Sequence, residues 1–476
     1  MEGEGLRRDF SNRSLEDIDK ETFVHPYTSI AEHLARGPRI FTKAEGIYVF
    51  DNHGKKYIDG FAGMGCVNVG FGRNEIADAI SEQSHKLAWY HTLAHASTEP
   101  MIRLSEKILD LAPSNMARVF LTCSGSEAND TQVRLVWYYN TVRGKPKKRK
   151  IISVKQGYHG ATVICACMTG VDVAHNGFGL PLEGFLYADC PHYYWNGEPG
   201  ETERDFSRRL AKQLDELIER EDPETVGAYI QEPVLGGGGS IVPPEGYFEE
   251  IGKVLKKHDV LFIDDEVVCG FGRLGRWFGC ERFGFTPDLM SIAKGLTSAY
   301  YPVSGAVISQ KIWDAMVEAS PRMGLFGHGN TYNGHPTGAA AALANIAIME
   351  RENLIENADK MGAYLGQRLH EEFDDHPLVG EVRGVGLLHA VELAADKKKK
   401  KGFDWALNIS EMAEDHCRNH GLIMHVAWPN SPACNSLLFA PPICITKNEV
   451  DEVVTRFGKG LKDLADQLVR DKIWRG

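Results

Sequence analysis

A lysine and an aspartate that follow two apolar segments are the residues of this chain best placed for chemistry. Lys294 lies in DLMSIAKGL, and Asp265 lies in the apolar run VLFIDDEVV. A lysine amine can form a Schiff base with an aldehyde cofactor. A buried carboxylate beneath a pyridine ring keeps the ring nitrogen protonated, because an opposite charge in a low-dielectric site favours the cation. A protonated ring accepts electrons from a carbanion, so this pair predicts pyridoxal phosphate (PLP) chemistry.

Six apolar segments between about residues 75 and 310 are expected to build the sheet that positions this pair. They read RVFLTC, RKIISV, VGAYIQEPV, VLFIDDEVV, DLMSIAK and VSGAVIS. Runs that are apolar on both faces are typical of buried strands in a mostly parallel α/β sheet. Ligands bind at the carboxyl ends of such strands, so Asp265 and Lys294 should converge on one crevice.

Three successive parts are expected along the chain. Residues 1–74 form an N-terminal segment that contributes to a small domain and a dimer contact, with a hairpin in IYVFDNHGKKYIDGFAG that turns at Asn52 to Gly54. Residues 75–335 form the large cofactor-binding domain. Residues 336–476 form a smaller α+β domain, which begins with an alanine-rich helix and continues with strands at VRGVGLLHAVEL, GLIMHV and LLFAPP.

Composition excludes several classes of protein. The chain has 476 residues, of which 43% are apolar and 25% charged, so disorder is not its main state. The net charge of -12 argues against a nucleic-acid partner, and the basic runs Lys145–Lys150 and Lys397–Lys401 are interpreted as solvated loops. The ten cysteines show no CxxC pair or metal-ligand spacing, which predicts reduced thiols in a cytoplasmic protein without a metal. Neither a signal peptide nor a membrane span is expected.

The segment SGSEAND, from Ser124 onward, is expected to bind a phosphate. It follows a strand and opens a helix, where free backbone N–H groups and the helix dipole favour an anion. Gly125 and Ser126 would hold the cofactor phosphate. Alternatively, this is an ordinary helix cap made by Ser126, with Glu127 and Asp130 in the first turn. The presence of Lys294 favours the phosphate.

Aromatic and apolar side chains are expected on both sides of the cofactor ring. Tyr158 and His159, in KQGYHGAT, follow a strand and could lie against the ring, although a Tyr-His pair in such a turn is often only structural. Val267 would lie on the opposite side, two residues after Asp265 on the same strand face.

A glycine motif offers a competing interpretation. Gly270 to Gly275 matches GxGxxG after a strand, as in a dinucleotide-binding loop. We reject it because the following segment, RWFGCERFGF, has no helical periodicity, and Asp288 precedes a strand instead of ending one. The run Gly236 to Gly239 is expected to be a flexible loop near the pocket mouth.

The motifs SGSEAND, GYHG, QEPV, FIDDEV, GFGR, SIAKGL and NTYNGHP occur in this order, and with them the chain resembles the class III aminotransferases of PLP fold type I. It is most similar to the branch that acts on omega-amino acids or on amines with pyruvate. The resemblance runs from about residue 25 to the C-terminus. It implies a large domain with a mostly parallel seven-stranded sheet flanked by helices, a smaller α+β domain, and a homodimer with shared active sites.

Roles for site residues follow from this resemblance. Lys294 would bond to the cofactor and shuttle a proton, while Asp265 would contact the pyridine nitrogen. Gly125 and Ser126, together with Thr331 of the partner subunit, would hold the phosphate, while Tyr158 would stack on the ring and Glu232 would support the site. The implied reaction moves an amino group from a primary amine or omega-amino acid to a keto acid such as pyruvate, by a ping-pong mechanism. A decarboxylase or an aminomutase uses the same lysine and aspartate, and a nicotinamide oxidoreductase is the more distant alternative.

Two departures from the family concern the substrates. His425 stands where the branch usually has an arginine that binds the acceptor carboxylate, and extra residues in WPNSPACN follow it. Gly65 replaces a frequent tryptophan, and Leu93 with Ala94 replaces two phenylalanines, which predicts an enlarged pocket for a bulky or long-chain amine. Alternatively, Trp89 or Trp428 fills the space. The expected substrate pocket comprises Met64, Gly65, Trp89, Leu93, Gly237 and His425.

Overall fold

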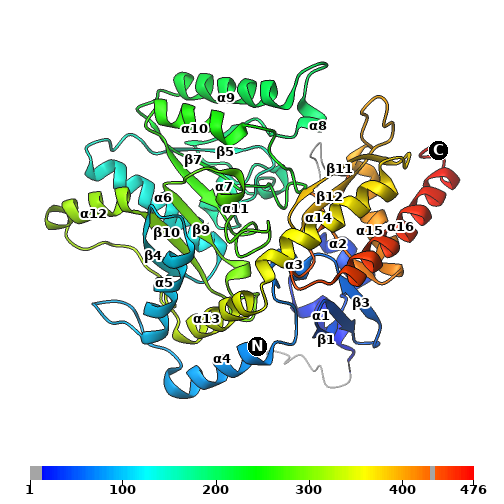
Figure 1. Cartoon of the computed structure of the whole chain (residues 1–476), viewed down its shortest axis with the longest axis horizontal. Coiled ribbons are helices and arrows are strands. Elements are labelled where there is room, and N and C mark those ends of the chain that lie inside the picture. The colour runs from blue at the N-terminus through cyan, green and yellow to red at the C-terminus, as the bar shows by residue number, and fades with distance from the viewer. Residues whose placement is uncertain (1–12, 429–434, 476) are drawn as a thin grey trace, which may run out of the picture.

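The structure, a computed structural model, describes residues 13–428 and 435–475 and is built around a seven-stranded sheet (Figure 1). The strand order is β4-β10-β9-β8-β7-β5-β6. Its strands are β4 (Met116–Thr122), β5 (Lys150–Val154), β6 (Phe185–Ala188), β7 (Val226–Gln231), β8 (Leu261–Asp265), β9 (Leu289–Ile292) and β10 (Ser304–Ser309). Only β10 runs antiparallel to its neighbours. The expected mostly parallel sheet is confirmed, and β6 is the strand that the six apolar segments did not include.

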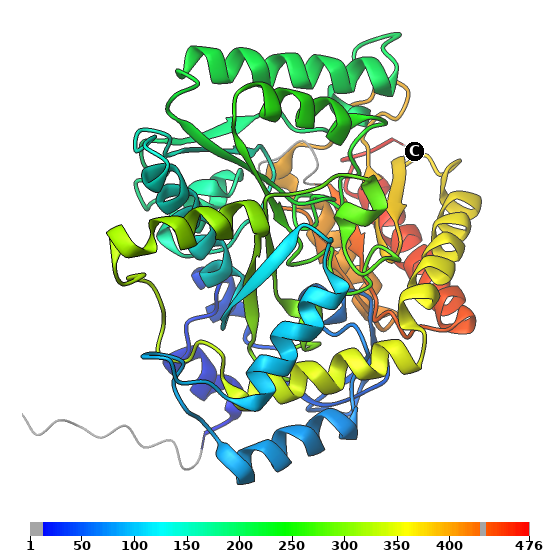
Figure 2. The same ribbon diagram turned by 60° about the vertical axis from the view of Figure 1, so that its left-hand side comes forward.

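Helices cover this sheet and connect its strands. They are α4 (Asn74–Leu87), α5 (Glu99–Leu111), α6 (Gly125–Val142), α7 (Val163–Met168), α8 (Tyr193–Asn196), α9 (Glu203–Arg220), α10 (Tyr247–Lys257), α11 (Gly279–Phe283), α12 (Gln310–Met323) and α13 (Pro336–Arg351), with short 3-10 turns η1 (Asp172–Ala174) and η2 (Lys294–Leu296). Helix α6 packs on β9 and β10, and α9 packs along α10. Helix α13 lies along α4 and α5, as Figures 1 and 2 show.

Two four-stranded sheets lie beside the large sheet. The first has the order β1-β2-β3-β13 and contains the predicted hairpin. The second has the order β11-β12-β15-β14. Their strands are β1 (Phe41–Glu45), β2 (Tyr48–Asp51), β3 (Lys56–Asp59), β11 (Val379–Val385), β12 (Leu388–Leu393), β13 (Leu422–Ile423), β14 (His425–Val426) and β15 (Ser436–Phe439).

The segment GLIMHV, expected to be one strand, serves both of these sheets. Strand β13 pairs with β3, whereas β14 pairs with β15, and the chain changes sheet at Met424. Helices α14 (Leu354–Phe373), α15 (Ile409–Asn419) and α16 (Lys447–Arg470) pack beside these sheets, and η3 (Trp405–Leu407) precedes α15. An apolar core extends from Ile47 to Leu468 and includes strands of the large sheet, so the two ends of the chain share one core. The domain boundaries stay predictions.

An N-terminal arm precedes the first sheet and contains α1 (Leu15–Thr22) and α2 (Ile30–Arg36). Both helices have serine caps, Ser14 and Ser29, and among the described residues neither helix buries a side chain. Within residues 13–428 and 435–475, no helix is long and apolar enough to cross a membrane.

One basic run differs from its interpretation as a solvated loop. Lys148 is fully buried, and its ammonium donates to the carbonyl oxygens of His258 and Asp259 at 2.8 and 3.0 Å. Lys150 begins β5. Residues 398–401 are exposed, as expected. The nine described cysteines are free thiols, and Cys434 lies outside the described residues.

Candidate active site

A cavity of about 290 Å³ lies where the strands of the large sheet end. It is lined by segments that follow β4, β5, β7, β8 and β9. Eight residues expected at the cofactor line it together: Gly125, Ser126, Tyr158, His159, Glu232, Asp265, Val267 and Lys294. Asp265 is the last residue of β8, and Lys294 lies just beyond β9, so the predicted convergence of their two strand ends is present in the fold.

Three donors hold the buried carboxylate of Asp265. The amide of Asn129 and the ring Nδ1 of His159 each lie 2.8 Å from Oδ2, and the main-chain N–H of Val267 donates to Oδ1 at 3.1 Å. This set fixes the orientation of the carboxylate. It also engages the ring of His159, whose Nδ1 atom is bonded to Asp265. Asn129 also donates to the main-chain oxygen of His159, so one amide contacts both His159 and Asp265.

Val267 lines the cavity, but it does not do so from the strand face of Asp265, as was predicted. Strand β8 ends at Asp265, so the alternation of a strand does not set the direction of Val267. Its methyl groups instead oppose Gly125, where a Cβ atom would lie 3.1 Å from both of them. Gly125 is therefore needed for the close approach of α6 to the turn after β8.

The N-terminus of α6 faces the cavity with its free backbone donors. Ser124, not Ser126, caps the helix, and its side chain accepts from the N–H of Glu127. The hydroxyl of Ser126 accepts from the N–H of Ala161 at 3.0 Å. The alternative of a cap at Ser126 is therefore wrong, and the first two residues of α6, Gly125 and Ser126, line the cavity at a helix N-terminus, where an anion is favoured.

Lys294 lies in a loop with unusual backbone geometry. Its φ is +45°, and Ser298 and Ala299 in the same loop have φ of +49° and +62°. Non-glycine residues in the left-handed region cost free energy and persist only where surrounding contacts hold them. This loop supplies Thr297, Ala299 and Tyr301 to the cavity wall.

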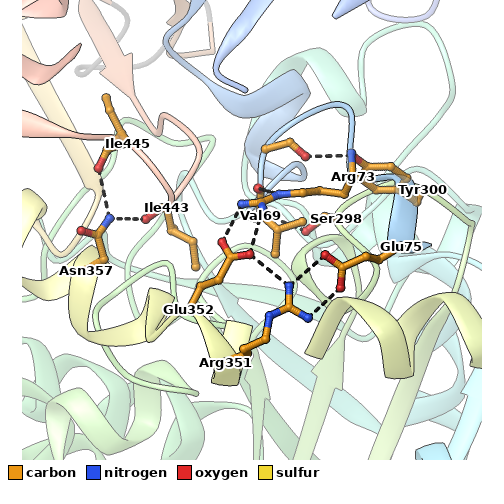
Figure 3. Close-up of polar contacts among 11 residues, drawn as sticks. Val69, Arg73, Glu75, Ser298, Tyr300, Arg351, Glu352, Asn357, Ile443 and Ile445 are labelled. Atoms are coloured by element: carbon orange, nitrogen blue, oxygen red, sulfur yellow. Dashed lines mark hydrogen bonds and ion pairs between the residues drawn. The ribbon is translucent and has the colours of Figure 1, made fainter. Parts of the chain in front are cut away.

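Polar contacts brace the loop from the N-terminal side of the fold (Figure 3). The hydroxyl of Ser298 accepts from the N–H of Val69 at 3.1 Å, and the hydroxyl of Tyr300 accepts from the N–H of Arg73 at 2.8 Å. Both guanidinium NH groups of Arg73 contact Glu352 at 2.9 Å, which ties the brace to the segment between α13 and α14. Lys294 is thus positioned by residues distant in sequence.

Glu232 lies behind Tyr158 and is buried. Its two oxygens accept from the N–H groups of Tyr158 and Gly236 at 3.0 and 2.9 Å. Burial raises the pKa of Glu232 to about 7, although these hydrogen bonds oppose the shift. Glu232 can therefore change its protonation state near neutral pH while it lines the cavity.

A left-handed turn brings Gly65 next to Val268, a residue of the cavity wall. Residues 62–65, α3 (Ala62–Gly65), all have positive φ, and Asp59 holds the turn by accepting from the N–H groups of Phe61 and Gly63. Gly65 is buried with φ of +66°, and a Cβ atom there would lie 3.7 Å from Val268, which lines the cavity. Met64 is 52% exposed.

The glycine run Gly236 to Gly239 is a buried turn and not the flexible loop that was expected. It is closed by the pairing of Leu235 with Ile241. A Cβ atom at Gly238 would lie 2.2 Å from the carbonyl of Gln156, and one at Gly237 would lie 2.9 Å from Trp428. Close approach of neighbours, and not mobility, explains these glycines.

Aromatic rings surround the outer part of the site. Trp428 stacks on Tyr158 at 5.3 Å and also contacts Tyr27, with centroids 5.0 Å apart. His425 stacks on Phe61 at 4.8 Å. Burial and the nearby charge of Lys294 lower the pKa of His425 to about 4, so its imidazole is neutral at pH 7. The rest of the extra segment, Pro429 to Cys434, lies outside the described residues.

Seven expected residues are absent from the cavity lining of the single chain: Met64, Gly65, Trp89, Leu93, Gly237, His425 and Thr331. Trp89, Leu93 and Thr331 lie on two adjoining loops, since Trp89 contacts Tyr332 with ring centroids 6.1 Å apart and Leu93 lies 3.9 Å from the Cβ position of Gly329. Leu93 is 60% exposed. These loops border the cavity, because the carbonyl of Tyr332 lies 3.6 Å from the Sγ atom of Cys123.

Several lining residues were missed by sequence reasoning, among them Asn129, Tyr301 and Val268. Asn129 follows Gly125 by one helical turn, so it lies on the same helix face, and this spacing could have revealed it. Nothing in the local pattern marks Tyr301 or Val268.

The glycine motif of Gly270 to Gly275 does not bind a ligand through a helix. It forms turns, and the short helix α11 begins only at Gly279. Arg273 within it is fully buried and donates to the carbonyls of Leu387 and Pro441 and to the side chain of Asn68. The rejection of a dinucleotide loop is confirmed.

Comparison with known proteins identifies the family. The family model for aminotransferase class III matches residues 30–461, so the chain belongs to the class III aminotransferases. It is 47% identical to an uncharacterized aminotransferase of Sinorhizobium fredii, over 96% of this chain and 98% of that protein. The omega transaminase of Pseudomonas jessenii in complex with PMP is 42% identical, with a TM-score of 0.93 and coverage of 96% and 99%.

A second solved structure bears on the substrate question. It is a variant of a thermostable omega transaminase in which a tryptophan is replaced by glycine, engineered for asymmetric synthesis of enantiopure bulky amines. It is 42% identical to this chain, with a TM-score of 0.92, and covers 96% of this chain and 100% of its own.

The family uses PLP, and the residues present fit that cofactor. One cavity combines an amine at Lys294, a buried and oriented carboxylate at Asp265, and a helix N-terminus with free donors at Gly125. These are the groups that an aldehyde, a pyridine nitrogen and a phosphate require. The expectations of an aminotransferase and of PLP are confirmed.

Proposed function

We propose that this aminotransferase transfers the amino group of a bulky or long-chain primary amine, or of an omega-amino acid, to a keto acid such as pyruvate by a ping-pong mechanism. The observation that carries the proposal is Gly65, where a Cβ atom would lie 3.7 Å from Val268, a residue that lines the cavity. The engineered relative gained its use with bulky amines through a variant with tryptophan replaced by glycine. The family resemblance described above implies that Gly65 stands where relatives often have a tryptophan, which supports the proposal.

Each site residue has a role that its surroundings support. PLP, when bound, supplies the aldehyde and the electron-accepting ring. Lys294 carries the amine that holds the cofactor and moves a proton at its Nζ atom. Asp265, fixed by Asn129 and His159, keeps a negative charge beneath the ring. The first N–H groups of α6 at Gly125 and Ser126 hold the phosphate.

The aromatic rings near the entrance suit a large apolar substrate. Tyr158, Trp428 and Tyr27 present adjoining faces, and aromatic faces bind flat apolar groups. Trp428 packs beside Gly237, and among the described residues only Val268 lies within 4 Å of a Cβ atom at Gly65, which supports the enlarged pocket over its filling by Trp428.

Acceptor choice depends on His425. Its neutral imidazole lacks the permanent charge and the two-pronged geometry with which arginine binds a carboxylate. Acceptors that need no cationic partner, such as aldehydes, should therefore be assayed alongside pyruvate and 2-oxoglutarate.

The proposal includes a homodimer with shared active sites. Trp89, Leu93 and Thr331 lie at the border of the cavity on exposed loops, which supports a position against a second copy. Thr331 of the partner subunit then contributes to the phosphate site. A cytoplasmic location is also proposed, supported by the free thiols of all nine described cysteines.

Two variants at one position test the enlarged pocket. Any side chain at Gly65 is strained by its positive φ, so Gly65→Ala serves as a control that adds strain but little volume. Gly65→Trp should lower kcat/KM for a bulky amine about tenfold or more relative to a small amine. Gly65→Ala should leave this ratio unchanged. Equal effects of Gly65→Trp on both amines would rule out the enlarged pocket.

A mixed-dimer experiment tests the shared site. Lys294→Ala removes the amine, and Thr331→Asp places a negative charge near the phosphate. If Thr331 acts on the partner's site, a mixed dimer of the two inactive variants contains one site with both native residues and regains activity. If both residues serve the same subunit, mixing restores nothing.

A further inference from the structure

A cluster of two histidines and an aspartate lies on the N-terminal arm, outside the active site. Asp19 comes from α1, His33 from α2, and His25 from the connection between them. The Nε2 atoms of His25 and His33 lie 2.9 and 3.1 Å from the same oxygen of Asp19, Oδ1. One ligand atom from each residue lies within 4.8 Å of the others.

The two histidine nitrogens are spaced from the aspartate oxygen as ligands of a zinc-like ion are. Zinc bonds of about 2.0–2.1 Å in a tetrahedron place neighbouring ligand atoms roughly 3.3 Å apart. The observed separations of 2.9 and 3.1 Å are only a few tenths of an ångström shorter than this. An ion between the atoms would require the ligand atoms to move apart by about that amount.

His33 provides an independent indication of a ligand. Its side chain is 10% exposed, and its Nε2 atom is buried without a hydrogen bond among the described residues, because the contact with Asp19 is close but poorly directed. A buried polar atom without a partner costs free energy, and a metal ion between the three residues would satisfy it. His25 and Asp19 are 29% and 23% exposed, which leaves a path for the ion and a position for water.

Other clusters of potential ligands are less suitable. In the group of Asp215, Glu219 and His258, the ammonium of Lys257 already contacts both oxygens of Asp215 at 2.7 and 2.9 Å. The group of Asp264, Glu266 and Cys280 is fully buried, so an ion would have no entry.

The arm also reaches the active site. Tyr27, between His25 and His33, contacts Trp428 and the cavity residue Tyr158, with ring centroids 5.0 and 6.2 Å apart. Its φ is +48°, a left-handed conformation that needs support from its surroundings. Helices of this length are marginal by themselves, and the arm gains little from burial.

We propose that Asp19, His25 and His33 bind one zinc-class divalent cation per subunit, with water in the remaining position, and that this ion fixes the arm that holds Tyr27 beside the active site. Two imidazoles and one carboxylate are a ligand set that zinc accepts. The site needs neither the cofactor nor the proposed substrate, so it is independent of the proposed function.

Zinc binding to the holoenzyme tests the site directly. Protein without a histidine tag is titrated with zinc by calorimetry, and one equivalent per subunit is expected. His33→Gln, His25→Gln and Asp19→Asn should each weaken this binding about tenfold or more. His53→Gln, an exposed histidine in the hairpin turn, is the matched control and should bind zinc as the parent does.

The first of two further measurements needs no variant, so it does not depend on how well a variant folds. Cobalt added to the unmodified holoenzyme should give the intense visible bands of a four-coordinate site, displaced by zinc. Hydrogen exchange across residues 19–33 should slow on zinc addition in the parent and in His53→Gln, but not in His33→Gln. Equal zinc binding by the parent and His33→Gln, or a parent that binds no zinc, would overturn the proposal.

Discussion

His425→Arg is the substitution that most directly tests acceptor recognition. Burial and the charge of Lys294 lower the pKa of His425 to about 4, so at pH 7 only about one imidazole in a thousand carries a proton. Arginine keeps its charge in the same position and offers two parallel donors to a carboxylate. A charge-assisted hydrogen bond contributes about 1.5–3 kcal/mol, which corresponds to a KM for pyruvate roughly ten- to a hundredfold lower.

The same substitution should carry a cost to stability. The guanidinium would enter the site beside Phe61 and near the ammonium of Lys294, and it cannot lose its charge as His425 does. We expect the free energy of unfolding to fall by about 1–3 kcal/mol. Chemical denaturation of the holoenzyme measures this change.

Steady-state kinetics with two acceptors separate charge from shape. KM for pyruvate should fall in His425→Arg, whereas KM for an aldehyde acceptor without a carboxylate should not. His425→Gln keeps a polar but neutral side chain and should leave both values near those of the parent. An unchanged KM for pyruvate in a folded His425→Arg holoenzyme would refute the reasoning and show that another group binds the carboxylate.

Four further outcomes are expected. Burial lowers the pKa of His389 to about 4, so as pH falls below about 6.5 the unfolded state binds more protons than the folded state. The protein therefore loses stability between pH 7 and pH 5. In urea titrations, His389→Gln should reduce this loss by about 2 kcal/mol. Glu232→Gln should remove an ionisation near pH 7 from the pH profile of kcat/KM, because the pKa of Glu232 is about 7. Arg273→Met should lower unfolding free energy by about 3–5 kcal/mol, since three buried acceptors lose their donor. Asp264→Leu should raise the melting temperature, because full burial and the neighbouring Glu266 disfavour a carboxylate there and raise the pKa of Asp264 well above its usual value; a lower value would contradict this.

The strands of the large sheet could be predicted because their signal is local. Each of the six apolar segments carries its own pattern, and a parallel sheet brings the carboxyl ends of its strands to one edge. The shared cavity of Asp265 and Lys294 follows from this geometry. Gly125 and Ser126 follow from the helix that must begin after β4.

Roles that depend on neighbours from distant segments could not be predicted in this way. The bond between His159 and Asp265 joins segments after β5 and β8, and the cap by Ser124 depends on where α6 begins. Local periodicity contains no information on which side chain reaches another across the sheet. The buried Lys148 illustrates the same limit, because its acceptors lie more than a hundred residues away along the chain.

By itself the sequence determined the cofactor of this protein, because a lysine, an aspartate and a phosphate-binding helix start occur in segments that each fold locally, and the order of its motifs indicated the family. Only the tertiary structure decided the protonation of His425 and the close packing of Gly236 to Gly239. It also separated β13 from β14 and placed Thr331 outside the cavity of its own chain. These properties depend on burial and on long-range contacts, which exist only once distant segments have packed together.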